Sequence, residues 1–284
     1  MLAEKLKRMT PSQRLVYFVK ERQQVYLRKK AGRPKPWTDD PILQSCYFCN
    51  IRREQDKTTV WVKENIRDLF QVDKVAFAVL AFRWFNYIPT GKILVGSGLL
   101  SNWDSNKAKK ALTGVGQIFT GAFTISPSGS TKPKLERVVD DYITPVWRNK
   151  EALAGLEACS TLADGFKILS QFPGMAGGGF MAAQVIADLR YTHLLKNRRD
   201  RTTWCCLGPG SKRGLNRFLN RPIASSLKAI HLDTVLQRVQ TAVNTIANPP
   251  LHMQDVQSCL CEFDKYERVL HNQGRSKRKY NGHF

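Results

Sequence analysis

The longest apolar run of the chain, VAFAVLAFRWFNYI, extends from Val75 to Ile88. A helix that is apolar on all sides is either buried in a protein core or spans a membrane. Arg83 and Asn86 interrupt this run, and it is too short to cross a bilayer as a helix. The run therefore predicts a helix buried inside the protein, and we expect no membrane segment.

Helical patterns also dominate the segments on either side of this run. The segment 10–32, TPSQRLVYFVKERQQVYLRKKAG, starts with a Thr-Pro pair, ends at a glycine and carries apolar residues at helical spacing. These features predict an amphipathic helix with a basic outer face. Further helical patterns cover residues 38–51, 58–70, 135–150, 160–172, 180–189, 231–248 and 253–274.

The segment 89–133 differs because it is rich in Gly, Ser, Thr and Lys, and only FTGAFTISPSG within it has a β-like pattern. We expect loops and a short β-hairpin there. The sequence thus predicts a mainly α protein with a small loop or β-hairpin insertion. Its expected parts are an N-terminal helical part (1–88), the insertion (89–133) and a C-terminal helical part with a basic tail (134–284), together one compact two-lobed molecule.

The chain carries 45 Lys and Arg residues against 23 Asp and Glu residues, a formal net charge of +22. Such an excess is self-repelling in a compact protein and is typical of proteins with a polyanionic partner, of which nucleic acid is the leading candidate. A lysine-rich solvated surface and an anionic membrane are the alternatives. The N-terminus has no apolar core of signal-peptide length, and seven cysteines fit a reducing compartment, so we expect a cytoplasmic protein.

A glycine-rich stretch, FPGMAGGGFMAAQVIADL, occupies residues 172–189. Neither it nor GPGSKRG at 208–214 has the G-x-x-x-x-G-K-[ST] spacing of a P-loop. A dinucleotide-binding loop follows a strand, whereas the residues before this stretch predict a helix. The remaining interpretations are close helix packing and a turn between two helices, where the N–H groups that begin the second helix bind an anion.

The order of this stretch, an apolar residue, Pro-Gly, further glycines and an alanine-rich helix, resembles the helix-hairpin-helix of DNA glycosylases. The resemblance implies that the turn binds a DNA phosphate and that a catalytic aspartate follows one helix later. Asp200, which lies 23 residues beyond Gly177, occupies that place. Ala176 departs from the pattern because it fills the position of the usual hairpin glycine.

A second group of chemically active residues lies in PWTDDPILQSCYFCNIRREQDKTT, residues 36–59. Arg52 and Arg53 form a pair that suits a phosphate, because each guanidinium binds two oxygens at once. An exposed, salt-bridged helix end is the alternative. The order ER, PWT-D-IL and F-N-RRE-D-TT resembles the N-terminal signature of the alpha-glutamyl/putrescinyl thymine pyrophosphorylases. These phage amino acid:DNA transferases are related to the helical domain of 5-hydroxymethyluracil DNA kinases.

Later blocks of that family are similar to IFTGAFTIS (118–126), ADLRYT (187–192), WCCLGPGSKRGLN (204–216) and LCEFDKYERV (260–269). The resemblance thus covers nearly the whole chain and implies a fold like that of the helix-hairpin-helix glycosylases. It further implies a transferase that acts on double-stranded DNA carrying phosphorylated 5-hydroxymethyluracil. The enzyme would replace the phosphate or pyrophosphate with a free amino acid or polyamine, after a 5-hydroxymethyluracil DNA kinase has acted.

This chemistry needs a base, cations for the departing phosphate and a pocket for a flipped base. We expect Asp200, with Asp188 as second candidate, to act as base or electrostatic stabiliser. The residues expected to bind DNA or phosphate are Arg52, Arg53, Lys57, Gly174, Gly177, Gly178, Gly208, Gly210, Ser211, Lys212 and Arg213. The residues expected in the base and amine pocket are Trp37, Thr38, Asn50, Glu54, Asp56, Trp204, Asn216, Glu262, Lys265 and Tyr266.

The cysteines suggest two other chemistries. Cys46 and Cys49 could bind zinc with Cys205 and Cys206, although the spacing matches no standard zinc finger. Cys205 or Cys206 could instead add to the uracil ring as a nucleophile. We expect no metal and no cofactor. Two alternatives for the whole protein are a DNA glycosylase acting on a modified pyrimidine and a non-catalytic DNA-binding partner of a 5-hydroxymethyluracil DNA kinase.

Overall fold

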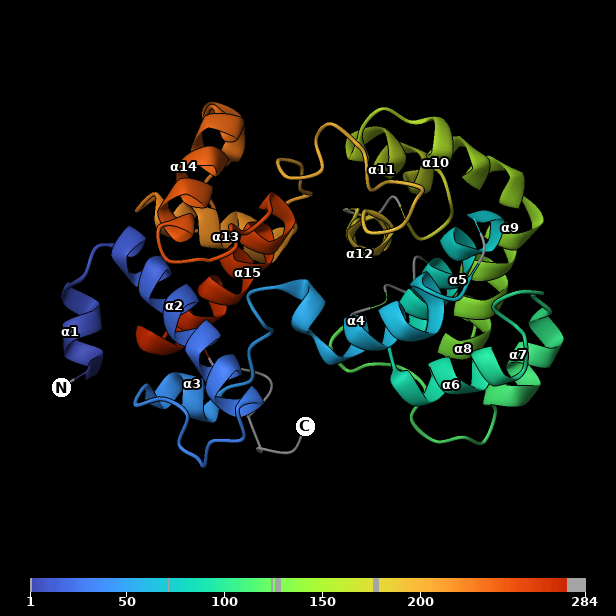
Figure 1. Cartoon of the computed structure of the whole chain (residues 1–284), viewed down its shortest axis with the longest axis horizontal. Coiled ribbons are helices and arrows are strands. Elements are labelled where there is room, and N and C mark those ends of the chain that lie inside the picture. Colours follow the sequence, from blue (N-terminus) through green and yellow to red (C-terminus); the bar gives the residue numbers. More distant parts are fainter. Residues whose placement is uncertain (1, 71, 124, 126–128, 176–178, 275–284) are drawn as a thin grey trace. The chain divides into compact units, whose positions relative to one another are not determined.

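The computed structural model describes residues 2–70, 72–123, 125, 129–175 and 179–274. It divides the chain into two compact units: unit 1 comprises Met1–Asp56 with Cys205–Phe284, and unit 2 comprises Lys57–Trp204 (Figure 1). The boundaries fall at 56/57 and 204/205, whereas the sequence-based division placed them at 88/89 and 133/134. Among the described residues helices dominate and no strand occurs, which confirms the mainly α prediction.

Unit 1 is built from helices that come from both ends of the chain. They are α1 (Leu2–Arg8), α2 (Pro11–Lys30), α3 (Pro41–Ser45), the 3-10 turn η1 (Arg53–Gln55), α13 (Pro209–Phe218), the 3-10 turn η5 (Leu227–Ala229), α14 (Leu232–Asn244) and α15 (Met253–Leu270). The start of α2 lies where the Thr-Pro pair predicts it, because Thr10 and Gln13 cap each other in a capping box. Phe18 of α2 packs on Phe263 and Tyr266 of α15, which closes the core of the unit.

The helix expected over residues 38–51 is much shorter in the structure. Asp40 caps α3, and its carboxylate accepts hydrogen bonds from the N–H groups of Ile42 and Leu43. From Cys46 onward the backbone is extended, and Phe48 is buried in the core of unit 1. The prediction was wrong here because burying Phe48 against α2 and α15 outweighs the local helical pattern.

The GPGSKRG segment, which supplies several of the predicted phosphate-binding residues, forms the first turns of α13. A Cβ atom on Gly214 would lie 2.0 Å from the carbonyl oxygen of Leu260, and one on Gly210 would lie 2.4 Å from the sulfur of Cys261. The two glycines therefore let α13 pack closely against α15 (Figure 1). The low helix propensity of glycine is offset by this contact.

Unit 2 is the more continuous part of the chain. Its elements are α4 (Lys57–Val62), the π-helix η2 (Lys63–Arg67), α5 (Val72–Phe85), α6 (Ile88–Gly96), α7 (Ser105–Leu112), α8 (Lys134–Glu136), the π-helix η3 (Arg137–Ile143), α9 (Thr144–Arg148), the 3-10 helix η4 (Lys150–Ala154), α10 (Gly155–Ala158), α11 (Leu162–Ser170) and α12 (Phe180–Leu189). Every side chain from Val75 to Phe85 is buried, which confirms the buried helix expected from the apolar run. Helix α12 packs against α5.

The predicted insertion 89–133 contains two helices rather than only loops. It includes all but the first residue of α6 and all of α7, which Asp104 caps through the N–H of Lys107. The β-like patch 119–129 lies partly outside the described residues, at 124 and 126–128, and the described rest of the patch forms no strand. Short helices therefore occur in a composition that favours loops.

Within the described part of the chain, no helix is both long enough and apolar enough to cross a membrane. The apolar helix α5 has 14 residues and contains Arg83, which agrees with its assignment to the core of unit 2.

Candidate functional site

Four of the residues predicted for the base and amine pocket lie together in unit 1. Glu262 of α15 accepts hydrogen bonds from the backbone N–H of Cys49 (3.1 Å) and from the ammonium of Lys265 (2.6 Å). The backbone N–H of Asn50 donates to Oδ1 of Asp56 (3.0 Å). With Arg22 and Tyr47, these residues form the Asp56–Glu262 cluster, whose seven members are all half-buried: Arg22, Tyr47, Cys49, Asn50, Asp56, Glu262 and Lys265.

Helix α2 holds the loop that carries the cluster. Nη2 of Arg22 donates to the side-chain oxygen of Asn50 (2.6 Å) and to the carbonyl of Phe48 (3.1 Å). The Phe48 ring packs edge-on against Phe18 of α2, with 5.4 Å between the ring centroids, and the Lys265 ammonium lies 4.6 Å from its centroid. The core of unit 1 therefore fixes the loop, and the polar groups around Asp56 are held in place before any ligand arrives.

Burial shapes the electrostatics of this cluster. It raises the pKa of the Asp56 carboxyl to about 6, against the opposing effects of the Asn50 N–H and of the positive charges of Arg53 and Arg22. Burial also raises the pKa of the Cys49 thiol, and the charges of Glu262 and Asp56 add to this effect. A carboxyl group with a pKa close to neutral pH is suited to exchange a proton with a substrate, and such shifts are concentrated at functional sites.

The predicted base and amine pocket does not include three members of the cluster, Arg22, Tyr47 and Cys49, and Cys49 was considered only as a zinc ligand. Tyr47 and Cys49 lie inside the 36–59 block that supplied Asn50 and Asp56, so this block was the available signal. Arg22 lies in the middle of α2, and its signal in the sequence was the ER pair, Glu21-Arg22, which comes first in the order of blocks that resembles the transferase family. Its role becomes visible only when the loop is placed against α2.

Thr38 and Tyr266 come together around Asp40 rather than around Asp56. The Tyr266 hydroxyl donates to Oδ2 of Asp40 (2.6 Å), and the Tyr17 hydroxyl donates to the same oxygen (3.2 Å). Thr38 Oγ1 accepts from the backbone N–H of Asp40 (3.1 Å), and the Asp40 side chain is buried. These contacts anchor the start of α3, which gives both predicted residues a structural role.

Of the other residues predicted for this pocket, Trp37 and Asn216 lie outside the Asp56–Glu262 cluster, and Glu54 lies at its edge. Trp37 follows the end of α2, where the ammonium groups of Lys29 and Lys35 lie 5.5 Å and 5.3 Å from its ring centroid. Glu54 belongs to the half-buried turn η1, two residues before Asp56. Asn216 is buried, and its amide donates to two carbonyls of the loop that follows α13.

The residues expected to hold a phosphate at the start of α13 are mostly engaged in packing. The Ser211 side chain is buried, and its hydroxyl donates to the carbonyl of Gly208 (3.0 Å) and accepts from the amide of Gln257 (3.0 Å). Nε of Arg213 forms an ion pair with Asp264 (2.9 Å). Lys212 is exposed, and its charge lowers the pKa of Cys206, although burial raises that pKa more strongly.

The other predicted basic residues, Arg52, Arg53 and Lys57, have different surroundings. Nη2 of Arg52 donates to the carbonyl of Pro249. The backbone N–H of Arg53 donates to Oδ1 of Asp255 (3.1 Å), and the charge of Arg53 acts on Asp56. Lys57 is exposed and begins α4 of unit 2.

Asp188 in unit 2 is fully buried and paired. Nε and Nη2 of Arg83 donate to its two carboxylate oxygens at 2.6 Å and 2.8 Å, and Arg83 also donates to the side chains of Asn86 and Thr59. The two polar residues that interrupt the apolar run thus belong to one buried network with Asp188. An enclosed carboxylate with both oxygens engaged is suited to holding α12 against α5, and it is not exposed to a substrate.

Asp200 caps a helix. Its two carboxylate oxygens accept hydrogen bonds from the backbone N–H groups of Leu162 (2.6 Å) and Ala163 (3.1 Å), at the start of α11. Trp204 packs against Phe166 of the same helix, with 5.4 Å between the ring centroids. The predicted catalytic aspartate and the predicted stacking residue therefore lie together, and both support α11.

The glycine-rich turn between α11 and α12 is described only in part. Gly174 has a φ of +74°, and a Cβ atom there would lie 2.8 Å from both Trp84 and Tyr142. This packing alone accounts for a glycine at position 174. Gly177 and Gly178, the other predicted phosphate-binding glycines, lie outside the described residues.

The cysteines give little support to the chemistries that their positions suggested. All seven are free thiols, and burial raises the pKa of Cys205 to about 12 and also raises that of Cys206. A thiol with a raised pKa stays protonated and is a poor nucleophile at neutral pH. Over the described residues, the structure contains no group of three or more His, Cys, Asp or Glu side chains that could hold a metal ion.

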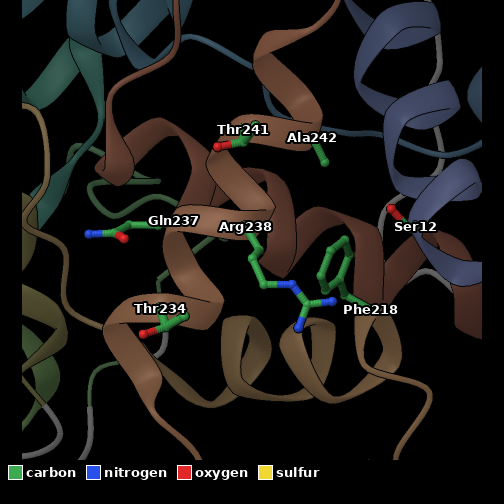
Figure 2. A pocket seen from close by; sticks show the side chains of 7 residues that line it. All are labelled: Ser12, Phe218, Thr234, Gln237, Arg238, Thr241 and Ala242. Carbon is green, nitrogen blue, oxygen red and sulfur yellow. The ribbon is translucent and has the colours of Figure 1, made fainter.

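Two pockets lie apart from the predicted residues. One, of about 500 Å³, lies on unit 1, where Arg238 and Phe218 line it with one face of α14 (Figure 2). Arg238 is the one ionisable residue in its lining. The other, of about 840 Å³, lies on unit 2 and has Phe77, Trp147 and Lys150 in its lining. Neither lining includes a predicted site residue.

Comparison with known proteins gives two further findings. The family described as "5-hmdU DNA kinase, helical domain" matches residues 10–276. A curated relative, the "5-hmdU DNA kinase" of Bacillus phage SP10, is 40% identical over 48 residues, which are 16% of this chain and 8% of the relative. The chain thus covers less than a tenth of that relative's length. No solved structure matches the chain.

Proposed function

Because the chain belongs to the family of the 5-hmdU DNA kinase helical domain, we propose that it is a phage DNA-modifying enzyme that transfers an amine to thymine. Within this family relationship, we assign it to the amino acid:DNA transferases that its sequence blocks resemble. Its substrate is double-stranded DNA whose 5-hydroxymethyluracil carries a phosphate or pyrophosphate. Its second substrate is a free amino acid or polyamine, and a 5-hydroxymethyluracil DNA kinase acts before it.

The observation that carries the proposal is the Asp56–Glu262 cluster. Four residues chosen from the sequence for a base and amine pocket, Asn50, Asp56, Glu262 and Lys265, lie around the Cys49-Asn50 backbone. Asp56 accepts from the N–H of Asn50, Glu262 accepts from the N–H of Cys49, and Lys265 donates to Glu262. Two carboxylates suit an incoming ammonium, and the positive charges of Arg22 and Lys265 suit a departing phosphate. The raised pKa of Asp56 makes its carboxylate a better base than an ordinary aspartate.

The proposed reaction starts with the amine bound as its ammonium form. Asp56 accepts one proton from it, and the freed nitrogen lone pair forms a bond to the 5-methylene carbon of the base. The bond between that carbon and the phosphate oxygen breaks, and its electron pair leaves with the phosphate or pyrophosphate. Glu262 holds the charge of the bound amine, while Lys265 and Arg22 stabilise the charge of the leaving group.

The target atom inside a duplex is accessible only when its nucleotide is extruded, so the reaction requires base flipping. Unit 1 supports binding to a polyanion, because it contains 25 Lys and Arg residues and 11 Asp and Glu residues, a net charge of +14. An excess of this size attracts DNA and speeds its association with the protein.

The test is incubation of the full chain with DNA bearing 5-phosphomethyluracil and mixed amino acids and polyamines, followed by mass spectrometry of the nucleosides. We expect a nucleoside heavier by the transferred amine. Asp56→Asn should lower the rate by at least about a hundredfold, as loss of general base catalysis does. The rate of the wild-type protein should rise with pH through about 6, where Asp56 loses its proton, and this limb should be absent from Asp56→Asn.

Asp200→Asn is the matched control in the other unit, because it also replaces a half-buried aspartate by its neutral isostere. If Asp200→Asn abolishes transfer in a folded protein while Asp56→Asn does not, Asp200 is the base that the glycosylase resemblance implies. Abasic sites in place of a heavier nucleoside indicate a glycosylase. DNA binding without turnover across the panel of amines indicates a non-catalytic partner of the kinase.

A further inference from the structure

A basic segment with one aromatic residue joins the end of α2 to the loop that follows it. Residues 28–37, RKKAGRPKPW, contain five cations, one tryptophan and no acidic residue. We call this segment the Trp37 patch. Lys30, Arg33 and Lys35 are exposed, and the Trp37 side chain is half-buried.

The Trp37 indole is fixed by its neighbours in the patch. Its Nε1 donates to the carbonyl of Arg33 (2.6 Å), and its own carbonyl accepts from Nη1 of Arg28 (2.5 Å). Arg28 is held in turn by an ion pair with Glu21 at 3.1 Å. A solvated basic surface has no need of a tryptophan restrained in this way, whereas a stacking platform has to be rigid.

The cations around the ring give the patch a second chemical property. The ammonium groups of Lys29 and Lys35 both lie within 6 Å of the Trp37 ring centroid. Ammonium groups over an aromatic ring match a nucleotide, whose base stacks on the ring in place of one ammonium group and whose phosphate binds the displaced cation. Proteins that bind single strands combine these two elements, and stacking requires a base that is not paired.

The patch lies close to the Asp56–Glu262 cluster along the same helix. Arg22, which donates to Asn50, and Lys29, which lies beside Trp37, are seven residues apart on α2. Two helical turns bring such residues to the same face, about 10 Å apart. A strand that contacts Lys29 is therefore close enough to present a nucleotide to the cluster.

We propose that the Trp37 patch binds an unpaired stretch of the DNA strand, with a base stacked on Trp37 and the phosphates on Lys29, Arg33 and Lys35. This strand flanks the nucleotide whose base enters the Asp56–Glu262 cluster. The inference rests on the proposed function in taking DNA as the partner. In this proposal Trp37 lies outside the amine pocket and binds the neighbouring stretch of the strand.

The first experiment measures the affinity of the full chain for unmodified, labelled oligodeoxythymidine by fluorescence anisotropy. Trp37→Ala should weaken binding roughly 5- to 150-fold, which corresponds to the loss of one stacked base. Trp37→Phe keeps an aromatic face and should recover most of the affinity. Equal affinities for Trp37→Ala and the wild-type protein, or an equal loss on single strands and on a fully paired duplex, would overturn the stacking.

The second experiment distinguishes binding by the Trp37 patch from binding through the overall charge of the protein. The triple variant Lys29→Gln, Arg33→Gln, Lys35→Gln should reduce the slope of log affinity against log salt concentration by about 2, as expected for three phosphate contacts on a single strand. The matched control neutralises three exposed cations elsewhere on unit 1, Lys5, Arg8 and Lys228. We expect a clearly smaller change in this control. Equal changes in both triples would show that net charge, not the patch, determines binding.

These binding measurements need neither a modified base nor an amine. If transfer occurs and the patch variants bind oligodeoxythymidine normally, the inference fails and the proposed function stands. If no amine yields a product and the patch variants still lose binding, the proposed function fails and the patch stands. A circular dichroism spectrum and a melting temperature for each variant show that a loss of binding does not reflect unfolding.

Discussion

Replacing Asp188 by asparagine tests whether this residue is structural or catalytic. The change preserves the shape of the side chain and removes its charge, which leaves the guanidinium of Arg83 buried without its carboxylate. In the native protein the pair is fully enclosed, with Nε–Oδ2 and Nη2–Oδ1 distances of 2.6 Å and 2.8 Å. Removing one partner of a buried pair costs about 3–5 kcal/mol, because the remaining charge is uncompensated.

This loss of about 3–5 kcal/mol should lower the melting temperature of unit 2. Unit 2 contains 148 residues, from Lys57 to Trp204, and a domain of this size loses about 2–4 °C in Tm for each kcal/mol. We therefore expect the transition of unit 2 to fall by roughly 6–20 °C in Asp188→Asn. Differential scanning calorimetry of the full chain measures this change, and urea denaturation should give a lower midpoint.

Two further variants make this result specific. The double replacement Arg83→Met with Asp188→Leu removes both charges and should recover much of the stability, because a buried pair is often no better than apolar residues of similar volume. Asp141→Asn removes one partner of the exposed Lys132–Asp141 pair and should leave the transition unchanged. If Asp188→Asn melts like the wild-type protein but no longer transfers an amine, the structural explanation is refuted and Asp188 is catalytic.

Single contacts also determine how substitutions at Asp56, at Gly214 and at Cys205 with Cys206 should behave. Asp56→Asn should be more stable than the wild-type protein above pH 6 and equally stable below about pH 4. Burial raises the pKa of the Asp56 carboxyl from 3.8 to about 6, which makes its charged form costly in the folded state. Urea denaturation at several pH values measures the difference in stability. Gly214→Ala should strongly lower the melting temperature, since its Cβ would lie 2.0 Å from a carbonyl oxygen of α15, whereas Gly208→Ala, with nothing within 4 Å of its Cβ, should have little effect. Cys205→Ser with Cys206→Ser should transfer the amine at a rate close to wild type, because burial raises the pKa of both thiols; complete loss of transfer in a folded double variant would support a thiol nucleophile.

The sequence predicts the individual helices better than their arrangement. The starts of α2 and α3 follow from Thr10-Pro11 and Asp40-Pro41, and the apolar run predicts α5 as a buried helix. Local periodicity contains no information on which helices meet. It therefore missed that α15, near the end of the chain, packs with α2 in one unit.

The site shows the same limit at the level of side chains. Chemical type and residue order led to the choice of Asn50, Asp56, Glu262 and Lys265, which the structure brings together. They were not sufficient to separate these residues from Ser211, which is of an equally suitable type and is buried in a helix contact. A polar side chain that supports a helix and one that faces a ligand look alike until burial and hydrogen-bond partners are known.

The surroundings of Asp200 and Asp56 bear on the choice between a glycosylase and a transferase. A glycosylase mechanism through Asp200 requires that carboxylate to act on the sugar or on a water molecule, yet both its oxygens already accept hydrogen bonds from the start of α11. In contrast, one carboxylate oxygen of Asp56, Oδ1, accepts from a backbone N–H, and burial has moved its pKa towards neutral pH. A transferase needs a base that can deprotonate an ammonium group, and a raised pKa improves that reaction. A raised pKa does not help a carboxylate that stabilises positive charge, because it reduces the fraction of the carboxyl group that is ionised. The raised pKa of Asp56 therefore supports the proton abstraction from an amine that we propose.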